Sequence, residues 1–235
     1  MKAYVGRRLS RWLIVMTALA LTAGLNTASA ADEEAGPDDP RVQLLNAIYN
    51  DDVSSVHTLL DEGVDPNIRE VKRGPALMLA VHEQSIRSVR ELLASPKLKI
   101  DAVNARGETA LMMAALIGQS ESVGLLIEKG AQINREGWTP LHYAATNGHL
   151  TVIKQLIEAG ADKNALSPNG TTPMMMAIRR GNLTAYQSLL VAGADPTVKN
   201  QRGLSAIDYL ERSGESERAQ LLREYAKSFT TKSTN

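Results

Sequence analysis

The sequence contains no cysteine among its 235 residues. Disulfides, a thiol nucleophile, cysteine-ligated zinc and a lipid-modified cysteine are therefore excluded. A chain without these supports must hold its shape by packing alone.

The sequence also lacks the motifs that usually carry catalysis. Its four histidines, His57, His82, His142 and His149, include no pair at a spacing of three or four residues, and no H-E-x-x-H is present. There is no G-x-S-x-G turn and no glycine-rich phosphate loop with a lysine. Ser, His and Asp all occur, so residue types alone do not exclude a triad. The pattern nevertheless argues against an enzyme, a metal site and a cofactor, and we expect no catalytic residue.

The amino terminus lacks acidic residues before Asp32 and begins with four basic ones. Residues 12–25 are mostly apolar, and Ala28-Ser-Ala30 follows. This order is typical of a secretory signal peptide over residues 1–30, cleaved after Ala30. Fourteen apolar residues are short against the roughly 20 needed to span a bilayer. We therefore expect export to the periplasm, with secretion farther out and an uncleaved membrane anchor left open.

Cleavage would remove four of the 26 basic residues and none of the 26 acidic ones, leaving a net charge of −4 on 205 residues. A mildly acidic chain argues against a nucleic-acid partner. Residues 31–40 are acidic, with two prolines, and predict a flexible acidic linker. Residues 229–235 predict a frayed polar tail, so the folded domain is expected over residues 41–228.

Within that domain a short pattern recurs at a period near 33. An apolar residue is followed three places later by alanine, and by leucine in the last case, with steps of 33, 34, 30, 33 and 33 residues. The first-position residues are Leu44, Leu77, Leu111, Leu141, Met174 and Ile207, and the second-position residues are Ala47, Ala80, Ala114, Ala144, Ala177 and Leu210. A fixed period of this size predicts an all-α solenoid of about six stacked helix-turn-helix units.

Residues 137–160 show the grammar of one unit most clearly. Thr139 suits a helix N-cap and Pro140 the first helical position. Gly148 can end that helix in the left-handed conformation. A second helix follows through Val152 to Ile157, and an extended segment then leads to a projecting turn. Thr109, Thr172 and Ser205 occupy the same capping place in other units.

Two units depart from this length. The segment 94–99 is one residue longer than its equivalents, and three residues are missing around 133–137. The second change should shorten one projecting loop and notch the edge of the array. The last unit carries many charges, as expected of a terminal cap with a polar outer face.

These residues resemble the ankyrin repeat. The signature G-x-T-P-L-H-x-A-A-x-x-G-H followed by L-L-x-x-G-A-D-x-N is nearly reproduced by residues 137–164, while 107–134 and 170–195 match well. The resemblance spans residues 41–228, with units near 41–69, 70–102, 103–133, 134–163, 164–198 and 199–228. It implies an ankyrin-repeat solenoid with projecting β-turn loops, and the leader suggests an exported bacterial member.

The resemblance also implies a binding module without catalysis, in which the concave face contacts a protein partner. That face would be lined by the residue after the turn glycine and by residues near the end of each first helix. The partner-binding residues expected on this basis are Leu116, Ile117, Trp138, Tyr143, Asn147, Arg179, Arg180 and Arg212, with Thr146 beside them. The family role of His142 is to tie loop to helix, and His149 is expected to be structural.

Three sets of residues near this face have alternative interpretations. Trp138 is expected to be exposed as an anchor, but it could instead pack on the next loop and fill the notch. Arg179 and Arg180 could face an acidic partner surface or simply be solvated at a helix end. Met113 and Met176 could belong either to the core or to the contact surface.

We expect a monomeric, non-catalytic periplasmic protein-binding module, either an adaptor or an inhibitor. Three alternatives remain: an immunity protein against a toxin acting in the periplasm, a helper of an exported defence enzyme such as a catalase, and a membrane-anchored structural scaffold. The partner's identity does not follow from the sequence.

Overall fold

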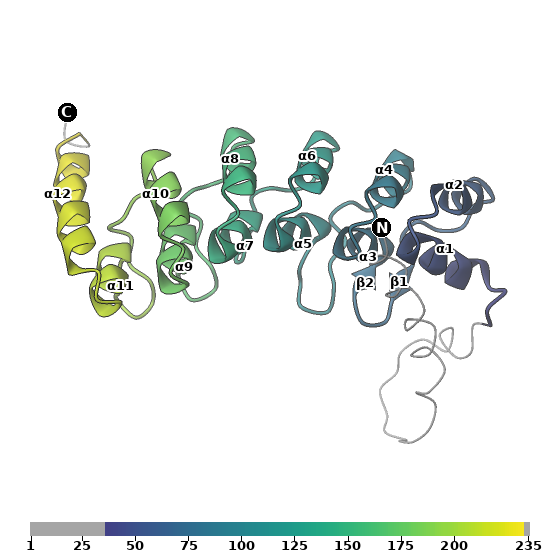
Figure 1. Ribbon diagram of the computed structural model, residues 1–235, viewed down its shortest axis with the longest axis horizontal. Helices are drawn as coiled ribbons and strands as arrows, with labels where there is room; N and C mark the ends of the chain where they lie inside the picture. The colour runs from purple at the N-terminus through teal and green to yellow at the C-terminus, as the bar shows by residue number, and fades with distance from the viewer. Residues whose placement is uncertain (1–35, 233–235) are drawn as a thin grey trace, which may run out of the picture. The chain divides into compact units, whose positions relative to one another are not determined.

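The computed structural model describes residues 36–232, which form a row of helix pairs (Figure 1). The expected signal peptide, most of the linker and residues 233–235 lie outside the described residues. One helix of each pair lies in a lower row in Figure 1, which we call the inner row: α1 (Pro40–Tyr49), α3 (Ala76–His82), α5 (Ala110–Ile117), α7 (Pro140–Asn147), α9 (Pro173–Arg179) and α11 (Ala206–Arg212).

The second helix of each pair lies in the outer row: α2 (Val53–Asp61), α4 (Ile86–Ala94), α6 (Ser120–Glu128), α8 (Leu150–Glu158), α10 (Leu183–Val191) and α12 (Ser216–Lys232). A two-residue antiparallel ribbon, β1 (Arg69–Glu70) with β2 (Gly74–Pro75), lies in the loop between the first two pairs. The expected all-α solenoid with projecting loops is confirmed.

The recurring apolar residues form the centre of the core. The first-position residues Leu44, Leu77, Leu111, Leu141 and Met174 are all buried, and so are the small or apolar residues three places later. Burying one such large side chain contributes about 2 kcal/mol, and alanine lets neighbouring inner helices approach closely. Ile207 is only partly buried because it lies in the last unit. Met113 and Met176 are buried too, so they belong to the core.

The inner helices begin at the expected caps. The hydroxyl oxygens of Thr109 and Thr172 each accept a hydrogen bond from a backbone N–H three residues on, at 3.3 Å. Ser205 accepts from the backbone N–H of Asp208 in the same way. These contacts satisfy donors that a helix start otherwise leaves unpaired. The predicted caps Thr109, Thr172 and Ser205 are therefore confirmed. Thr139 likewise precedes α7, with its hydroxyl in contact with His142 Nδ1 at 2.9 Å.

Two glycines end inner helices in the left-handed region. Gly118 closes α5 at φ 77°, and Gly148 closes α7 at φ 75°. A side chain at Gly118 would also collide with the ring of His149, whose Nδ1 lies 2.5 Å from an added Cβ. The turn thus needs glycine both for its backbone angle and for the approach of the next repeat.

Asparagine side chains link successive extended segments after the outer helices. Asn134 Oδ1 accepts from the backbone N–H of Asp162, and Asn164 Oδ1 accepts from that of Asp195, both at 2.8 Å. Asp162 and Asp195 in turn accept backbone N–H bonds two residues on, as predicted for the G-A-D turn. These bonds join one repeat to the next along the edge of the array.

The structure differs from the sequence prediction at both ends of the domain. Helix α1 begins at Pro40 with Asp39 as its cap, so the last two residues of the expected linker belong to the helix start. Helix α12 continues to Lys232, past the expected end at residue 228. The polar segment from residue 229 therefore extends the helix for four residues instead of beginning the tail.

The connection between α6 and α7 projects less than its neighbours (Figure 1). It runs from Lys129 to Thr139, whereas the connection between α8 and α9 runs from Ala159 to Thr172. The three missing residues thus leave a notch in the row of loops, and Trp138 lies at its end. Among residues 36–232, no helix is both long enough and apolar enough to cross a membrane.

Candidate partner-binding surface

Each inner helix ends in two residues that precede the turn to its outer helix. We call these positions together the inner-helix face: Tyr49 and Asn50, His82 and Glu83, Leu116 and Ile117, Thr146 and Asn147, Arg179 and Arg180, and Arg212 and Ser213. The positions recur with the repeat, so the chain presents them on the same side of successive units (Figure 1). Six of the eight residues predicted to bind a partner lie here, all except Trp138 and Tyr143.

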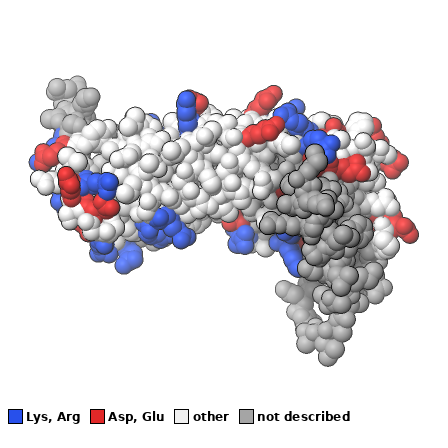
Figure 2. Space-filling model, viewed as in Figure 1, with Lys and Arg blue, Asp and Glu red and all other residues white. Residues whose placement is uncertain are grey.

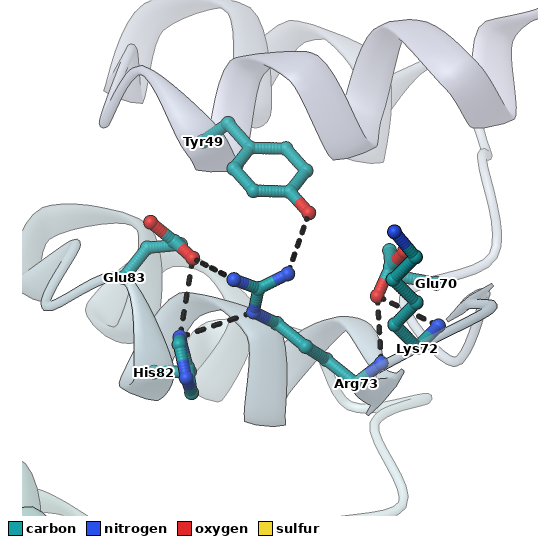
Figure 3. Close-up of polar contacts among 6 residues, drawn as sticks. All are labelled: Tyr49, Glu70, Lys72, Arg73, His82 and Glu83. Atoms are coloured by element: carbon teal, nitrogen blue, oxygen red, sulfur yellow. Dashed lines mark hydrogen bonds and ion pairs between the residues drawn. The ribbon is translucent and has the colours of Figure 1, made fainter. Parts of the chain in front are cut away.

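The second repeat carries a closed polar cluster at this face (Figure 3). Arg73, in the ribbon loop, donates from Nε to His82 Nδ1 at 3.0 Å and pairs with Glu83 at 3.0 Å. Its third contact is with the hydroxyl of Tyr49 in the first repeat, at 3.2 Å. The Arg73 guanidinium also lies over the Tyr49 ring, 5.8 Å from its centre. All three nitrogens of the guanidinium thus have contacts within the chain.

The ribbon loop that holds Arg73 is itself fixed by a carboxylate. Glu70 Oε2 accepts the backbone N–H groups of Lys72 at 3.0 Å and Arg73 at 2.6 Å (Figure 3). A carboxylate that bonds two amides of a tight turn restricts the turn's conformations. The loop therefore delivers Arg73 to the end of α3 in one defined geometry. Sequence reasoning missed this cluster, although the loop arginine and the His82–Glu83 pair were visible.

The third and fourth repeats are apolar or internally bonded at the same face. Leu116 and Ile117 are partly buried against the core. Asn147 is exposed, but its side-chain amide donates to the carbonyl of Leu116 at 2.7 Å. His149 Nε2 contacts the same carbonyl at 3.0 Å, which confirms its structural role. These contacts hold α7 in register with α5.

Trp138 is half-buried rather than exposed, so the prediction of an exposed anchor was wrong in degree. The ring of His142 meets it edge-on at 5.3 Å between centroids, and that of Tyr143 at 6.4 Å. Such edge-to-face arrangements are favourable for aromatic rings. Part of the Trp138 side-chain surface is therefore buried within its own repeat, and only the remaining surface is exposed at the notch.

Tyr143 is also tied to its neighbours. Its hydroxyl donates to Glu108 at 3.0 Å, and burial together with the Glu108 charge raises the pKa of Tyr143 to about 12. Burial would raise the pKa of Glu108, but hydrogen bonds from Asn104, Arg106 and Tyr143 outweigh it and lower that pKa. The Glu108 carboxylate is thus compensated within the chain.

His142 lies under this surface and joins two repeats. Its Nδ1 accepts from the backbone N–H of Thr139 at 3.2 Å, and its Nε2 donates to the carbonyl of Thr171 at 2.9 Å. Burial lowers the pKa of His142 to about 4, so the ring is neutral at pH 7. The predicted loop-to-helix tie is confirmed, and it also reaches the next loop.

Arg179, Arg180 and Arg212 are exposed at the ends of α9 and α11. Within residues 36–232, none of the three side chains forms an ion pair or a hydrogen bond. Lysine and arginine side chains gather along the lower edge over α9 and α11 in the space-filling view (Figure 2). The predicted residues therefore divide into an internally engaged central group and three free arginines.

The described residues contain no group of three or more His, Asp or Glu side chains that could hold a metal ion. The buried polar residues of the described part are His142, the N-cap residues of four inner helices, and six residues of loops and outer helices: Ser85, Ser88, Ser122, Ser167, Thr171 and Asn200. What the surface offers is a row of fixed helix ends with a few exposed polar side chains. Such a surface suits recognition of another molecule. The fold and the surface together define this protein as a repeat solenoid that binds a partner.

A family model described as ankyrin repeats (3 copies) matches residues 44–136, 77–167 and 133–200. The chain therefore belongs to the ankyrin-repeat family, a protein–protein interaction fold that is generally non-catalytic.

Several curated proteins share these repeats. The chain is 37% identical over 113 residues to palmitoyltransferase AKR1 of Lachancea kluyveri, covering 46% of this chain and 15% of that protein. It is 35% identical over 111 residues to rat ankyrin repeat and SAM domain-containing protein 6, covering 46% and 12%. It is 33% identical over 93 residues to mouse protein phosphatase 1 regulatory subunit 27, covering 38% and 60%.

The chain thus matches less than two thirds of each of these relatives. They come from a yeast and two mammals, and so do not bear on the bacterial origin expected from the leader.

Proposed function

We propose that this chain is an exported adaptor or inhibitor that binds another protein through its inner-helix face and performs no chemistry itself. The observation that carries the proposal is the set of exposed polar side chains, Asn147, Arg179, Arg180 and Arg212, on fixed helix ends. Helix ends in a packed array lose little freedom on binding, so such contacts convert efficiently into affinity.

The aromatic pair at the notch supports the same surface. Trp138 and Tyr143 are half-buried and held by their neighbours, which orients their remaining exposed surface before a partner arrives. Tryptophan and arginine are the residues most often found at the energetic centre of interfaces. One relative is named a regulatory subunit of a phosphatase, which agrees with a role in modulating another protein.

Export rests on the basic and apolar leader with its Ala28-Ser-Ala30 ending. Expression of the full chain in a Gram-negative host, followed by amino-terminal sequencing of the periplasmic fraction, tests this part. We expect a mature chain that starts at Ala31. An intact amino terminus in the membrane fraction would instead indicate an anchored protein.

The binding surface can be tested without knowing the partner. A photo-crosslinking amino acid replaces Asn147 on the inner-helix face, and a matched variant carries it at Lys154, which is exposed on the outer helix α8. After irradiation in periplasmic extract of the source cells, we expect a discrete crosslinked product from the first variant alone. Equal products from both positions, or a product from Lys154 only, would contradict the proposal.

A further inference from the structure

The polar side chains of the inner-helix face differ systematically along the chain. In the first, second and fourth repeats they all bond within the protein: Tyr49 and His82 to Arg73, Asn50 to the carbonyl of Asn46, Thr146 to that of His142, and Asn147 to that of Leu116. Ser213 at the end of α11 likewise donates to Leu210. Arg179, Arg180 and Arg212 are the exceptions within the described part of the chain.

The carboxylates near these arginines form ion pairs or hydrogen bonds with other residues. Glu211, the residue before Arg212, pairs with Arg223 of α12. Glu215 pairs with Arg218, one turn along α12. Asp208 accepts from the hydroxyl and the backbone N–H of Ser205 at the cap of α11, and these bonds lower the pKa of Asp208. The last repeat thus has acidic residues, but none of them neutralises the three arginines.

A second difference lies in the contact between the last two repeats. His149 contacts the Leu116 carbonyl, and Asn182 donates to the Thr146 carbonyl. Each of these two side chains belongs to the residue after a turn glycine, and each reaches the end of the inner helix in the preceding repeat. The equivalent residue in the last repeat is Glu215, which as a carboxylate has no proton to donate. The end of α9 therefore lacks the side-chain cover that α5 and α7 receive.

The three arginines are arranged across two adjacent helices. α9 packs directly on α11, and packed helices lie about 8–10 Å apart. Arg202, in the loop before α11, is also exposed without an ion pair among residues 36–232. A peptide in the extended polyproline II conformation has three residues per turn and advances about 3.1 Å per residue. Residues three apart therefore lie on one side of it and about 9 Å from each other, the step from one helix end to the next.

The geometry points to one kind of partner, an inference that rests on the proposed function. That partner is a protein with an extended acidic segment, and the carboxylates of this segment bind Arg179, Arg180 and Arg212. Arginine forms paired hydrogen bonds with carboxylates, and the missing internal partners leave these groups available. A segment with an acidic residue at every third position would place successive carboxylates at successive helix ends. Nucleic acid is the less favoured ligand, since Tyr209, the one aromatic residue of α9 and α11, is partly buried against the core and its hydroxyl accepts a hydrogen bond from Asn200, so its ring is not free for bases to stack on.

The test uses the purified full chain and two fluorescent peptides of about 12 residues, sized from the polyproline II rise. One carries glutamate at every third position in a serine and glycine background, and the other carries glutamine at the same places. A single-stranded oligonucleotide of equal net charge is the third probe. Fluorescence anisotropy at low salt measures each affinity.

The variant Arg179→Glu/Arg180→Glu/Arg212→Glu removes the proposed contacts. Its matched control, Arg90→Glu/Lys129→Glu/Lys154→Glu, makes the same change in net charge with exposed residues on or after outer helices. Circular dichroism checks that both variants fold. We expect the glutamate peptide to bind the wild type, with about tenfold or greater loss in the first variant and less than about twofold in the control.

Three outcomes would overturn the inference. They are equal binding of the glutamate and glutamine peptides, equal losses in the two variants, and tighter binding of the oligonucleotide. If one of these occurs while the crosslink from position 147 still forms, the inner-helix face binds a partner of different chemistry. If that crosslink is also absent, the proposed function fails as well.

Discussion

The second and fifth repeats have charged residues at the same position of the fold, but the side-chain contacts of these residues differ. In the second repeat, His82 and Glu83 end α3 and bind Arg73 from the adjacent loop (Figure 3). In the fifth, Arg179 and Arg180 end α9, and their side chains form no ion pair or hydrogen bond among residues 36–232. The position is the same, so the repeat does not require a polar contact there. The difference shows which end of the surface stabilises the chain and which end remains free to bind.

We therefore expect polar groups bonded within the chain to stabilise it and free polar groups to contribute little. Unfolding free energies test this expectation, together with the looser contact between the last two repeats.

Acidification should show the largest effect, through His142. Burial holds the folded-state pKa at about 4, below the ordinary 6.5, so the unfolded chain takes up a proton first as the pH falls. Stability is therefore full above pH 6.5 and declines between 6.5 and about 4, by about 3 kcal/mol in total. Urea unfolding at the two ends of this range measures the loss.

Carboxylates also contribute at low pH, so the control is His142→Gln, which cannot titrate. We expect this variant to lose markedly less stability than the wild type over the same range. An equal loss in both proteins would mean that His142 is not the group responsible.

Gly118→Ala should cost about 2 kcal/mol, because alanine is strained at φ 77° and its Cβ would meet the His149 ring. Gly181 follows the end of α9 in the fifth repeat and also has φ 75°, but an added Cβ there has nothing within 4 Å. Gly181→Ala should therefore cost only the backbone strain, about 1 kcal/mol. Equal costs in thermal or urea unfolding would contradict the looser contact between the last two repeats.

Arg73→Ala should destabilise the chain by about 1 kcal/mol, since it removes the bonds to Tyr49, His82 and Glu83 at a partly exposed site. Urea unfolding at pH 7 and low salt measures this change. Arg73→Lys retains the charge without the three-way geometry and should recover only part of it. If Arg73→Lys kept the full unfolding free energy of the wild type, the positive charge alone, and not the three-way geometry, would account for the stabilisation.

The smallest effect is expected at the free arginines. Arg179→Ala and Arg180→Ala should each change the unfolding free energy by less than about 0.5 kcal/mol, since neither side chain has a partner to lose among residues 36–232. The same urea titration used for Arg73 provides the comparison. Destabilisation equal to that of Arg73→Ala would show that these arginines serve the fold.

Much of the fold could be predicted because each unit repeats the same local sequence pattern. The caps Thr109 and Thr172, the turn glycines and the apolar period each have a local physical cause, and their phase fixes the stacking. The helix extension to Lys232 was missed because polar residues such as Thr and Lys do not by themselves end a helix.

The site was less predictable because it depends on contacts between repeats. Periodicity places Trp138 and Arg179 on one face but says nothing about their neighbours. Trp138 is half-buried because His142 and Tyr143 turn toward it, and Arg179 is free because nearby acids pair elsewhere. Likewise, Arg73 meets His82 only once the ribbon loop folds back to the end of α3.

A crystal structure of the chain with the spaced glutamate peptide would show where an acidic segment binds. We expect an extended peptide along the ends of α9 and α11, with its carboxylates within hydrogen-bond distance of Arg179, Arg180 and Arg212. A peptide bound on the outer row, or at Arg73 with those three arginines left in solvent, would contradict it.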